Sequence, residues 1–396
     1  MGNGARLAPP ALDDAALPPP PHPVLVGFSG GGDSTALLAL MARRLGPERL
    51  RAVVVDHGLR TGSAAVADAA AARASRWGVA VEVVRLRAPG RAQAAWRRAR
   101  LEAFCAAARR NEAVHIALGH TADDQAETLL IRAAAGSGLA GLAAMAPLAP
   151  VPLWPEGRGL TLARPMLGLR RSALRAWLEA EGLPWSEDPA NADPRHTRVR
   201  ARAALAALEA GGFDPLRLCR LAATIGAGVA RLNAAAAAWI AAHAAFDGPT
   251  ILLPRAAFAA DAAALRGFAA LVAAAGGADR PPARRRILAL AARLGDAAFK
   301  GATLGGARIK IASGDRLVLA RDPGAIAGRA GVPPAAPLRL APGGDGVWDA
   351  RLWARAGATA ITLPGEADAA AAHDWLLAAR AAHLLGQLGD AGFTGR

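Results

Sequence analysis

Ser29-Gly30-Gly31-Gly32-Asp33-Ser34 lies between an apolar run at residues 24–28 and a helix-forming run at residues 34–45. Glycines let a backbone come close to a phosphate, and the free N–H groups at a helix N-terminus face it with the positive end of the helix dipole. A buried strand, a glycine turn and a helix start are therefore predicted here. Together they would form an anion-binding site.

The type of phosphate loop follows from the residues around the glycines. The common form G-x-x-x-x-G-K-[ST] needs a lysine, and the lysines of this chain are Lys300 and Lys310. The stretch instead matches S-G-G-x-D-S, the pyrophosphate loop of enzymes that split ATP into AMP and pyrophosphate. A plain glycine turn is the alternative, but Asp33 and the two serines are spaced for a phosphate and its Mg²⁺.

Length and charge bound the class of protein. The chain has 396 residues, enough for two or three domains at roughly 150 residues each. Its formal net charge is +15, supplied almost wholly by arginine. The guanidinium is always ionised and its planar fork suits phosphate, so nucleic acid fits as a partner. The alternative is compositional, because abundant Ala, Gly and Arg with almost no Lys are also typical of a GC-rich genome.

Cysteine use and hydropathy limit the cellular setting. Cys105 and Cys219 stand far apart and form no C-x-x-C pair, which argues against zinc, an iron–sulfur cluster or a disulfide scaffold. Two buried thiols in a reducing compartment are predicted. The N-terminus has no secretory pattern, and the longest apolar stretch, near residues 234–245, is shorter than the roughly 20 residues that a bilayer needs. We expect a cytoplasmic protein that does not enter a membrane.

Short apolar runs alternate with helical stretches after residue 23, which predicts an α/β fold with a parallel sheet and helices on both faces. A mostly helical domain and a small C-terminal segment are predicted to follow. The predicted strands cover residues 24–28, 52–56, 81–86 and 114–119, with a later hairpin at 309–311 and 317–319. The predicted helices cover residues 34–45, 64–77, 92–109, 123–134 and 169–181. The predicted domains are a disordered tail (1–22), a catalytic domain with the glycine loop (23–205), a helical domain (206–298) and a small terminal domain (299–396).

The second predicted strand ends in Asp56 and His57. Ligands of open parallel sheets bind at the carboxyl ends of the strands, so an acidic residue there could contact a ribose or an adenine edge. A role for either residue in forming the turn is an equal alternative.

The fourth predicted strand leads into Gly119-His120-Thr121-Ala122-Asp123-Asp124-Gln125-Ala126-Glu127-Thr128. If Thr121 caps the following helix, Asp124 and Glu127 are three residues apart and share one face. Two carboxylates on one face suit Mg²⁺ or a cationic amine. The alternative is ordinary helix chemistry, since Thr121 with Asp124 forms a capping-box pattern and acids favour the first turn.

Taken together, these segments resemble the tRNA(Ile)-lysidine synthases of the N-type ATP pyrophosphatase superfamily. The resemblance covers residues 24–202, nearly half of the chain. It rests on S-G-G-G-D-S at Ser29, V-D-H-G-L-R at Val55, G-H-T-A-D-D-Q-A-E-T-L-L at Gly119 with G-S-G-L-A-G-L at Gly136, R-P-M-L-G-L-R-R at Arg164 and E-D-P-A-N-A-D at Glu187.

The resemblance implies a ligase with two steps. ATP adenylates the C2 oxygen of the wobble cytidine in the isoleucine tRNA with a CAU anticodon, and free lysine then replaces AMP to give lysidine. ATP and Mg²⁺ are the implied cofactors, the tRNA and lysine are the implied partners, and a homodimer is compatible with the sequence.

The same resemblance implies residue roles. Asp33, His120, Asp124 and Glu127 are the expected catalytic residues: Asp33 and Asp124 as metal ligands, Asp124 and Glu127 for the lysine ammonium, and His120 for the attacking amine. The expected ATP-binding residues are Ser29, Gly30, Gly31, Gly32, Asp33, Ser34, Asp56 and His57.

Arginines near these motifs are the expected contacts to tRNA phosphates, with a solvated helix face as the alternative. They are Arg97, Arg100, Arg195, Arg198 and Arg200. Trp96 and Trp185 could stack on a base, whereas Trp177 is expected in the core.

The chain departs from the family pattern at two places, and two other functions stay open. Val199 stands where the family has Asn, Trp96 precedes Arg97 where Ala is usual, and Leu101 follows Arg100 where Tyr is usual. These departures affect local tRNA or lysine contacts rather than the loop. One alternative is another tRNA-modifying enzyme with the same pyrophosphate loop (PP-loop) that uses a different amine. The other is a tRNA-binding relative without catalysis.

Overall fold

The chain is described by a computed structural model at residues 7–58, 62–86, 93–187, 197–257, 261–328, 334–364 and 372–386. It divides into two compact units, Met1–Val229 and Ala230–Arg396. The long helix α8 (Leu216–His243) crosses the boundary between them. The two units are described separately below.

A six-stranded sheet with the order β3-β2-β1-β4-β6-β5 organises the first unit. Neighbouring strands from β3 to β6 are parallel, and β5 pairs with β6 antiparallel at the edge. The elements are β1 (Val24–Gly27), α1 (Gly32–Leu45), β2 (Leu50–Asp56), α2 (Ser63–Ser75), β3 (Ala80–Arg85), α3 (Gln93–Arg110), β4 (His115–Ala117), α4 (Ala122–Ala134), α5 (Leu139–Leu142), β5 (Leu148–Pro150), β6 (Thr161–Ala163), α6 (Arg171–Ala180) and α7 (Thr197–Ala210).

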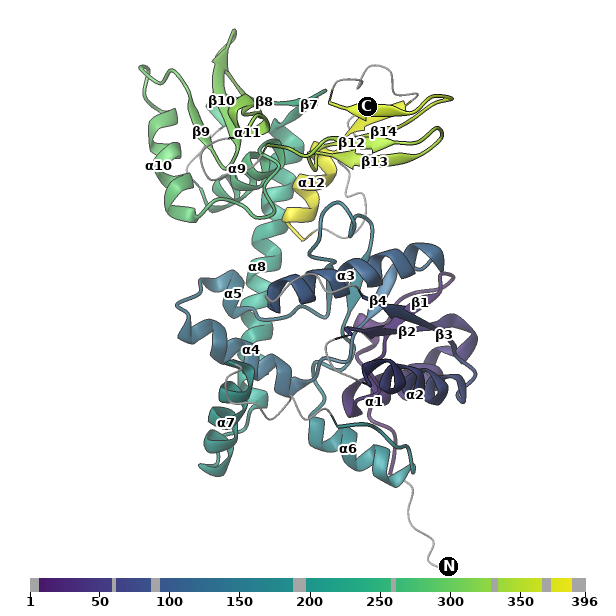
Figure 1. Cartoon of the computed structure of the whole chain (residues 1–396). Helices are drawn as coiled ribbons and strands as arrows, with labels where there is room; N and C mark the ends of the chain where they lie inside the picture. Colours follow the sequence, from purple (N-terminus) through teal and green to yellow (C-terminus); the bar gives the residue numbers. More distant parts are fainter. Residues whose placement is uncertain are drawn as a thin grey trace, which may run out of the picture. The chain divides into compact units, whose positions relative to one another are not determined.

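Helices cover both faces of this sheet because its central strands are apolar on both sides. Val24 and Val26 of β1 pack in one cluster with residues of α1, α2 and α6. Leu25, between them, points to the other face and packs with Phe104 of α3. In Figure 1, α3 accordingly lies on the opposite side of the strands from α1 and α2. The predicted parallel α/β fold with helices on both faces is confirmed.

Each of the predicted strands and helices of this unit is present, with bounds that shift by a few residues. Strands β5 and β6 were not predicted, because a three-residue strand in a Gly- and Pro-rich segment shows no detectable period. The tail prediction differs from the structure at residues 7–22. Ala16 there is fully buried, and the backbone N–H of Asp13 donates to the carbonyl of Pro165 at 2.9 Å.

The second unit contains antiparallel strands and several helices. One sheet has the order β7-β8-β11-β10-β9, and smaller sheets pair β12 with β15 and β13 with β14 and β16. The predicted hairpin at 309–311 and 317–319 is the β10–β11 pair. The elements are β7 (Ala245–Asp247), β8 (Thr250–Pro254), α9 (Ala262–Ala275), α10 (Arg284–Leu294), β9 (Ala302–Leu304), β10 (Ala307–Ala312), β11 (Arg316–Arg321), α11 (Pro323–Ile326), β12 (Leu338–Leu340), β13 (Asp345–Trp348), β14 (Leu352–Arg355), β15 (Ile361–Leu363), β16 (Ala372–Trp375) and α12 (Leu377–Leu384).

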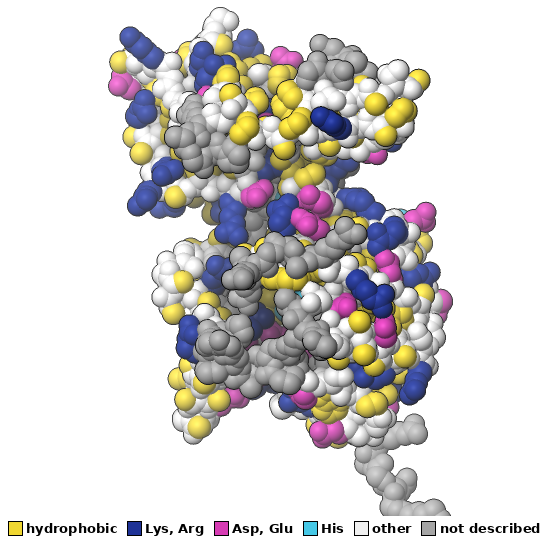
Figure 2. Space-filling view, viewed as in Figure 1, with side chains coloured by type: hydrophobic (Ala, Val, Ile, Leu, Met, Phe, Trp, Pro, Cys, Tyr) yellow, Lys and Arg dark blue, Asp and Glu magenta, His cyan; other side chains and the backbone are white. Residues whose placement is uncertain are grey.

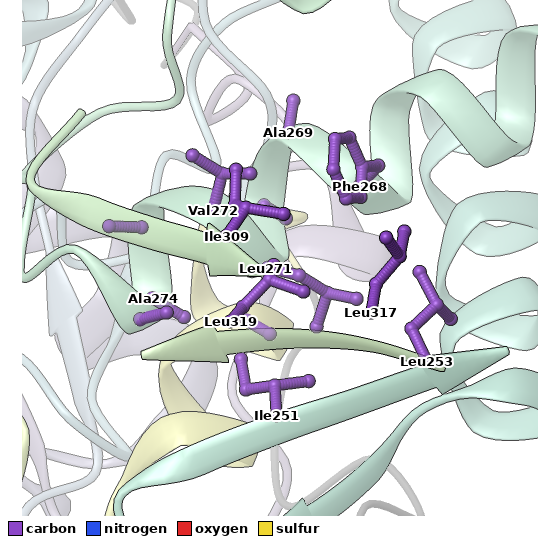
Figure 3. Packing of buried hydrophobic residues seen from close by; sticks show 14 of the residues in the cluster. Ile251, Leu253, Phe268, Ala269, Leu271, Val272, Ala274, Ile309, Leu317 and Leu319 are labelled. Carbon is purple, nitrogen blue, oxygen red and sulfur yellow. The ribbon is translucent and has the colours of Figure 1, made fainter. Parts of the chain in front are cut away.

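The core of the second unit lies between its five-stranded sheet and α9. Alternate residues of β8 and β11, including Ile251 and Leu319, point toward Phe268 and Leu271 of α9 (Figure 3). Alternation with period two is what buries one face of an antiparallel sheet. The domain boundaries predicted after residues 205 and 298 stay predictions.

Helix α8 is longer than the apolar stretch that was expected at residues 234–245. It has 28 residues and, by length and composition alone, could cross a membrane. Its apolar character is largely alanine, and core helices of globular proteins have similar lengths and compositions. That the chain does not enter a membrane therefore stays a prediction.

Candidate active site

The glycine loop joins the end of β1 to α1 and holds its own shape through its two serines. Ser34 Oγ donates to the carbonyl of Gly31 at 2.9 Å and accepts from the backbone N–H of Ser29 at 3.2 Å. Gly30 has φ +78°, in the left-handed region that favours glycine. A Cβ on Gly30 would also collide with the guanidinium of Arg73. The loop is therefore preformed, and its backbone favours glycine at Gly30.

A second segment supports the loop from outside. Arg73 Nη2 donates to the carbonyl of Gly30 at 3.3 Å and to Ser186 Oγ at 3.0 Å. The backbone N–H of Ser186 donates to the same carbonyl at 2.8 Å. The ring of Trp185, predicted as a base-stacking candidate, lies 3.4 Å from where a Cβ of Gly32 would be. In this structure Trp185 therefore packs against the loop.

Helix α1 leaves its first N–H groups available. Gly31 precedes the helix in an extended conformation, and no side chain caps it. The first N–H groups of a helix have no intrahelical acceptor, and they attract anions. Asp33 lies in this first turn, where its carboxylate can contact a metal ion that accompanies a bound phosphate.

Arg171 connects the loop to the acidic residues of α4. Its Nε donates to Asp33 Oδ2 at 3.1 Å, and its Nη2 donates to Asp124 Oδ1 at 3.2 Å. Its Nη1 lies 3.5 Å from Glu127 Oε1. One guanidinium therefore brings together the predicted catalytic carboxylates of Asp33, Asp124 and Glu127.

The capping box predicted at Thr121 is present and uses one oxygen of Asp124. Asp124 Oδ2 accepts from the backbone N–H and the hydroxyl of Thr121, both at 2.9 Å. Asp124 Oδ1 faces Arg171. The structural and functional interpretations of this motif are thus compatible, because each uses a different oxygen of the same carboxylate.

Glu127 is the most deeply buried of the three acids, with a fully buried side chain. Arg202 Nε donates to its Oε1 at 3.0 Å, and Arg198 Nε lies 3.6 Å from its Oε2. A buried carboxylate is tolerated when cations pair with it. Helix α7, which carries both arginines, supplies that charge.

The environment separates the pKa values of the two aspartates. Burial and the charge of Asp124 raise the pKa of Asp33, and the neighbouring Arg171 offsets this only in part. Burial acts on Asp124 in the same direction, but the charge of Arg171 and the bond from Thr121 together hold its pKa below the usual value. Asp124 is therefore the stronger acid of the pair.

His120 lies between the acidic residues and a group of arginines. Burial lowers its pKa to about 4, the charges of Arg164 and Arg198 act in the same direction, and Asp124 opposes them. Its Nδ1 is buried without a hydrogen-bond partner among the described residues. The imidazole is thus neutral at pH 7, and a pKa this low makes it a weak base.

Asp56 and His57 lie at the end of β2. Asp56 Oδ1 accepts from the backbone N–H of Gly58 at 2.9 Å, which lowers the pKa of Asp56. This bond supports the turn-forming alternative for Asp56. Burial lowers the pKa of His57, whose ring meets Trp96 edge-on with centroids 5.8 Å apart. Their predicted contacts with the nucleotide stay predictions.

The predicted tRNA-binding arginines fall into different settings. Arg97 and Arg100 lie on α3, and the pKa of Arg100 is lowered by burial and then by Arg97 and Arg198. Arg198 faces Glu127 and Asp124, whereas Arg200 donates to Thr197 Oγ1 at 3.2 Å. Arg195 lies outside the described residues. On the visible surface in Figure 2, basic side chains are present on both units, and acidic side chains are interspersed among the basic ones.

Comparison with known proteins decides the family. A PP-loop domain family matches residues 11–209. The tRNA(Ile)-lysidine synthase of Hyphomonas neptunium is 39% identical over 296 residues, which are 72% of this chain and 78% of that protein. That of Caulobacter vibrioides is 40% identical over 363 residues, 89% of this chain and 79% of that protein. The chain belongs to the tRNA(Ile)-lysidine synthase family.

One similar solved structure is more distant in sequence. The U34-tRNA thiolase NcsA from Methanococcus maripaludis has a TM-score of 0.41 and 18% identity, over 52% of this chain and 70% of that chain. That likeness is too remote to inform function. The family predicted from the motifs is confirmed by the curated relatives, while the roles of individual residues stay predictions.

No role was predicted for three of the site's arginines, although Arg164 and Arg171 belong to the motif R-P-M-L-G-L-R-R. Arg171 and Arg202 pair with the acids, and Arg164 is buried with a pKa lowered by burial to about 10. One signal was available for Arg171. It begins α6 directly after Arg170, and cations at a helix N-terminus are unfavourable unless something compensates. Asp123 compensates, because its Oδ2 accepts from the backbone N–H of Arg171 at 2.7 Å.

The residues present fit a magnesium ion bound together with nucleotide. Mg²⁺ in nucleotide sites is usually held by one or two carboxylates, with phosphate and water completing its shell. Asp33 and Asp124 supply two carboxylates that converge on one guanidinium beside the loop. Among the described residues no group of three or more His, Cys, Asp or Glu is placed to hold a metal, so the phosphates would have to complete the site.

Proposed function

We propose that this chain joins free lysine to C2 of the wobble cytidine in the isoleucine tRNA that has a CAU anticodon, in the cytoplasm. ATP is split to AMP and diphosphate in the same reaction. The observation that carries the proposal is the convergence of Asp33, Asp124 and Glu127 on one arginine beside the helix N-terminus of the loop. Membership of the tRNA(Ile)-lysidine synthase family supports it.

The chemistry has two steps. In the first, the C2 oxygen of the cytidine attacks the α-phosphorus of ATP and diphosphate leaves. In the second, the lysine amine attacks C2, the bond between C2 and the adenylate oxygen breaks, and AMP leaves. The amine gives up a proton in this second step, so the site needs a base.

In the first step the loop would bind the diphosphate portion of ATP. Ser29 and Ser34 would contribute hydroxyls, and Gly30, Gly31 and Gly32 would allow close approach of the backbone. A Mg²⁺ ion held by Asp33 and Asp124 would neutralise the charge that develops on the leaving diphosphate. Asp124 is suited to this role because it is ionised at neutral pH, with a pKa held below the usual value.

For the second step, Asp124 and Glu127 would orient the lysine ammonium and His120 would accept a proton. The pKa of His120, about 4, leaves the imidazole unprotonated but weakly basic at pH 7, and the negative charge of Asp124 would stabilise the imidazolium once a proton is accepted. The carboxylate of Glu127 already pairs with Arg202. An incoming ammonium would therefore share this carboxylate with an arginine, which would favour weak and readily reversible binding of lysine.

The tRNA would be held mainly through its phosphates. Arg97, Arg100, Arg198 and Arg200 lie on α3 and α7, and Arg195 precedes α7 in the sequence. Phosphate contacts position a nucleic acid without reading its sequence. Binding should therefore weaken steeply with salt. A homodimer stays a prediction.

The test uses the purified chain with ATP, Mg²⁺, labelled lysine and an unmodified transcript of the CAU-anticodon isoleucine tRNA. The readout is label retained on tRNA after mild alkali, which removes aminoacyl esters. We expect alkali-stable label, and none when the wobble cytidine is replaced by uridine. AMP released only with a different amine would instead indicate another tRNA-modifying activity. Salt-sensitive tRNA binding without AMP would indicate a relative that binds but does not catalyse.

A further inference from the structure

We propose that Arg171 is a further active-site residue, which holds the carboxylates of Asp33 and Asp124 until a divalent cation arrives together with nucleotide. Its guanidinium would then move from these carboxylates to a phosphate of ATP. The inference rests on the proposed function, because it takes Asp33 and Asp124 as the metal-binding pair.

The guanidinium of Arg171 occupies the position where a divalent metal ion would have to bind. Arg171 uses Nε for Asp33 Oδ2 and Nη2 for Asp124 Oδ1, at 3.1 and 3.2 Å. Because Asp124 Oδ2 is engaged by Thr121 in the capping box, Oδ1 is the oxygen left for a metal. A metal bound through this oxygen and Asp33 would compete directly with the guanidinium.

The charges favour an exchange rather than simple addition. The side chain of Arg171 is only 16% exposed. If its guanidinium left the carboxylates without meeting another anion, it would lose its ion pairs without regaining full hydration. A phosphate would restore the pairing, because guanidinium binds phosphate and carboxylate with the same fork. The cation and the nucleotide should therefore bind cooperatively.

The rest of the site can stay in place while the side chain moves. The backbone N–H of Arg171 remains bound to Asp123 Oδ2 at 2.7 Å, which fixes the start of α6. Glu127, the third acid that Arg171 faces, keeps Arg202 at 3.0 Å and Arg198 at 3.6 Å. Release of Arg171 would thus expose Asp33 and Asp124 without leaving Glu127 unpaired.

The experiment measures Mn²⁺ binding by electron paramagnetic resonance, with and without a non-hydrolysable ATP analogue. The wild-type chain should bind Mn²⁺ at least about tenfold more tightly when the analogue is present, a coupling of ordinary size for linked sites. Without nucleotide, Arg171→Gln should bind Mn²⁺ about tenfold more tightly than wild type. With the analogue, that advantage should disappear, because the variant lacks the group that moves to the phosphate.

Arg43→Gln is the matched control. Arg43 also links α1 to the end of α6, through Glu181, but pairs with neither Asp33 nor Asp124. It should leave Mn²⁺ binding unchanged in both conditions. Arg171→Lys keeps a positive charge without the fork and should show an intermediate affinity, and thermal melting of each variant monitors folding.

The outcomes separate this inference from the proposed function. Equal nucleotide-free Mn²⁺ affinity in wild type, Arg171→Gln and Arg171→Lys would overturn the role of Arg171. If the three affinities are equal and Asp33→Asn abolishes Mn²⁺ binding, the assignment of the metal site to Asp33 stands and only the exchange of Arg171 is rejected. Mn²⁺ binding that Asp33→Asn does not change would reject the metal site itself, and with it the basis of the inference.

Discussion

A Cβ atom on Gly119 would lie 3.0 Å from the backbone carbonyl oxygen of Asp33 and 3.2 Å from the backbone nitrogen of Ser34. The chain after β4 therefore passes directly against the start of α1. These contacts are with backbone atoms, which cannot turn aside as a flexible side chain could. The close approach sets the position of His120 relative to the glycine loop.

Gly119→Ala should accordingly displace the loop. We expect overpacking to cost about 1–3 kcal/mol of the free energy of unfolding, and the KM for ATP to rise because the loop and the α1 N-terminus shift. Thermal melting and ATP-dependent diphosphate release measure the two effects. Gly168→Ala is the control, since nothing lies within 4 Å of its Cβ position. Equal behaviour of the two variants would contradict the close approach.

Asp33→Asn should separate activity from stability. Burial raises the pKa of Asp33, so the ionised side chain is held at a cost that a neutral amide avoids. We expect an unchanged or higher melting temperature together with a loss of diphosphate release of about 100-fold or more, because a charged metal ligand is removed. Asp68→Asn removes an exposed partner of Arg85 and should retain activity. A folded Asp33→Asn enzyme with full activity would contradict the assigned role.

Glu127→Gln should lower stability. The substitution removes the negative charge of a fully buried carboxylate. The guanidinium groups of Arg202, Arg198 and Arg171 would then face a neutral amide. Since Arg202 and Arg198 are 40% and 47% exposed and stay partly hydrated, we expect a modest cost of about 1–2 kcal/mol. Urea unfolding measures it, with the exposed Glu179→Gln as control. The KM for lysine should rise more than that for ATP, and an equal rise in both would argue against lysine binding here.

His120 should make the folded state sensitive to acid. Its pKa in the folded state is about 4, below the usual 6.5, so between these values the unfolded chain binds a proton that the folded chain does not. Stability is therefore unaffected by this group above about pH 6.5 and falls as the pH drops from there toward 4. His57, His115 and His383 act in the same direction, so the contribution of His120 has to be isolated by substitution.

The variant His120→Asn isolates the contribution of His120 to the loss of stability in acid. Urea unfolding at about pH 7.5 and about pH 5 should show a smaller loss of stability in the variant than in wild type. His373→Asn, at an exposed histidine, should lose as much as wild type. If His120→Asn loses as much stability as wild type, the imidazole is not buried in its neutral form.

Cys105 should be unreactive in the folded protein. Burial raises the pKa of its thiol to about 12, and the thiolate is the reactive species. Cys219 is only half-buried, but the pKa of its thiol is also raised by burial and its Sγ donates to the carbonyl of Ala122 at 3.2 Å. Mass spectrometry after iodoacetamide treatment near pH 8 should find Cys105 unlabelled and Cys219 slowly labelled. Both should label in urea, and rapid native labelling of Cys105 would contradict its burial.

Local sequence predicted much of the first unit. The apolar runs at β1 and β2, the glycines before α1 and the Thr121–Asp124 capping box each act within a few residues. Period and turn chemistry can therefore identify them without knowledge of the fold. The same patterns missed β6, whose burial depends on its neighbour β4 rather than on its own three residues.

The carboxylates of the candidate site could be predicted, but the arginines that pair with them could not. Asp33 and Asp124 belong to motifs with recognisable spacing, and the structure brings them together as expected. Arg198 was predicted as a tRNA contact, which stays a prediction, whereas its pairing with Glu127 and Asp124 was not predicted. A charge on an exposed helix face and a charge that pairs with a buried acid look alike in sequence.

The sequence by itself determined the central parallel strands of the first unit with the helices between them, the glycine loop and the family, because each depends on residues close together along the chain. Only the tertiary structure decided that Arg171 joins Asp33 to Asp124, across 138 and 47 positions of sequence. Ion pairs over such separations depend on how α6 packs beside α1 and α4. That packing is set by side chains distributed over the whole sheet, and no local pattern records it.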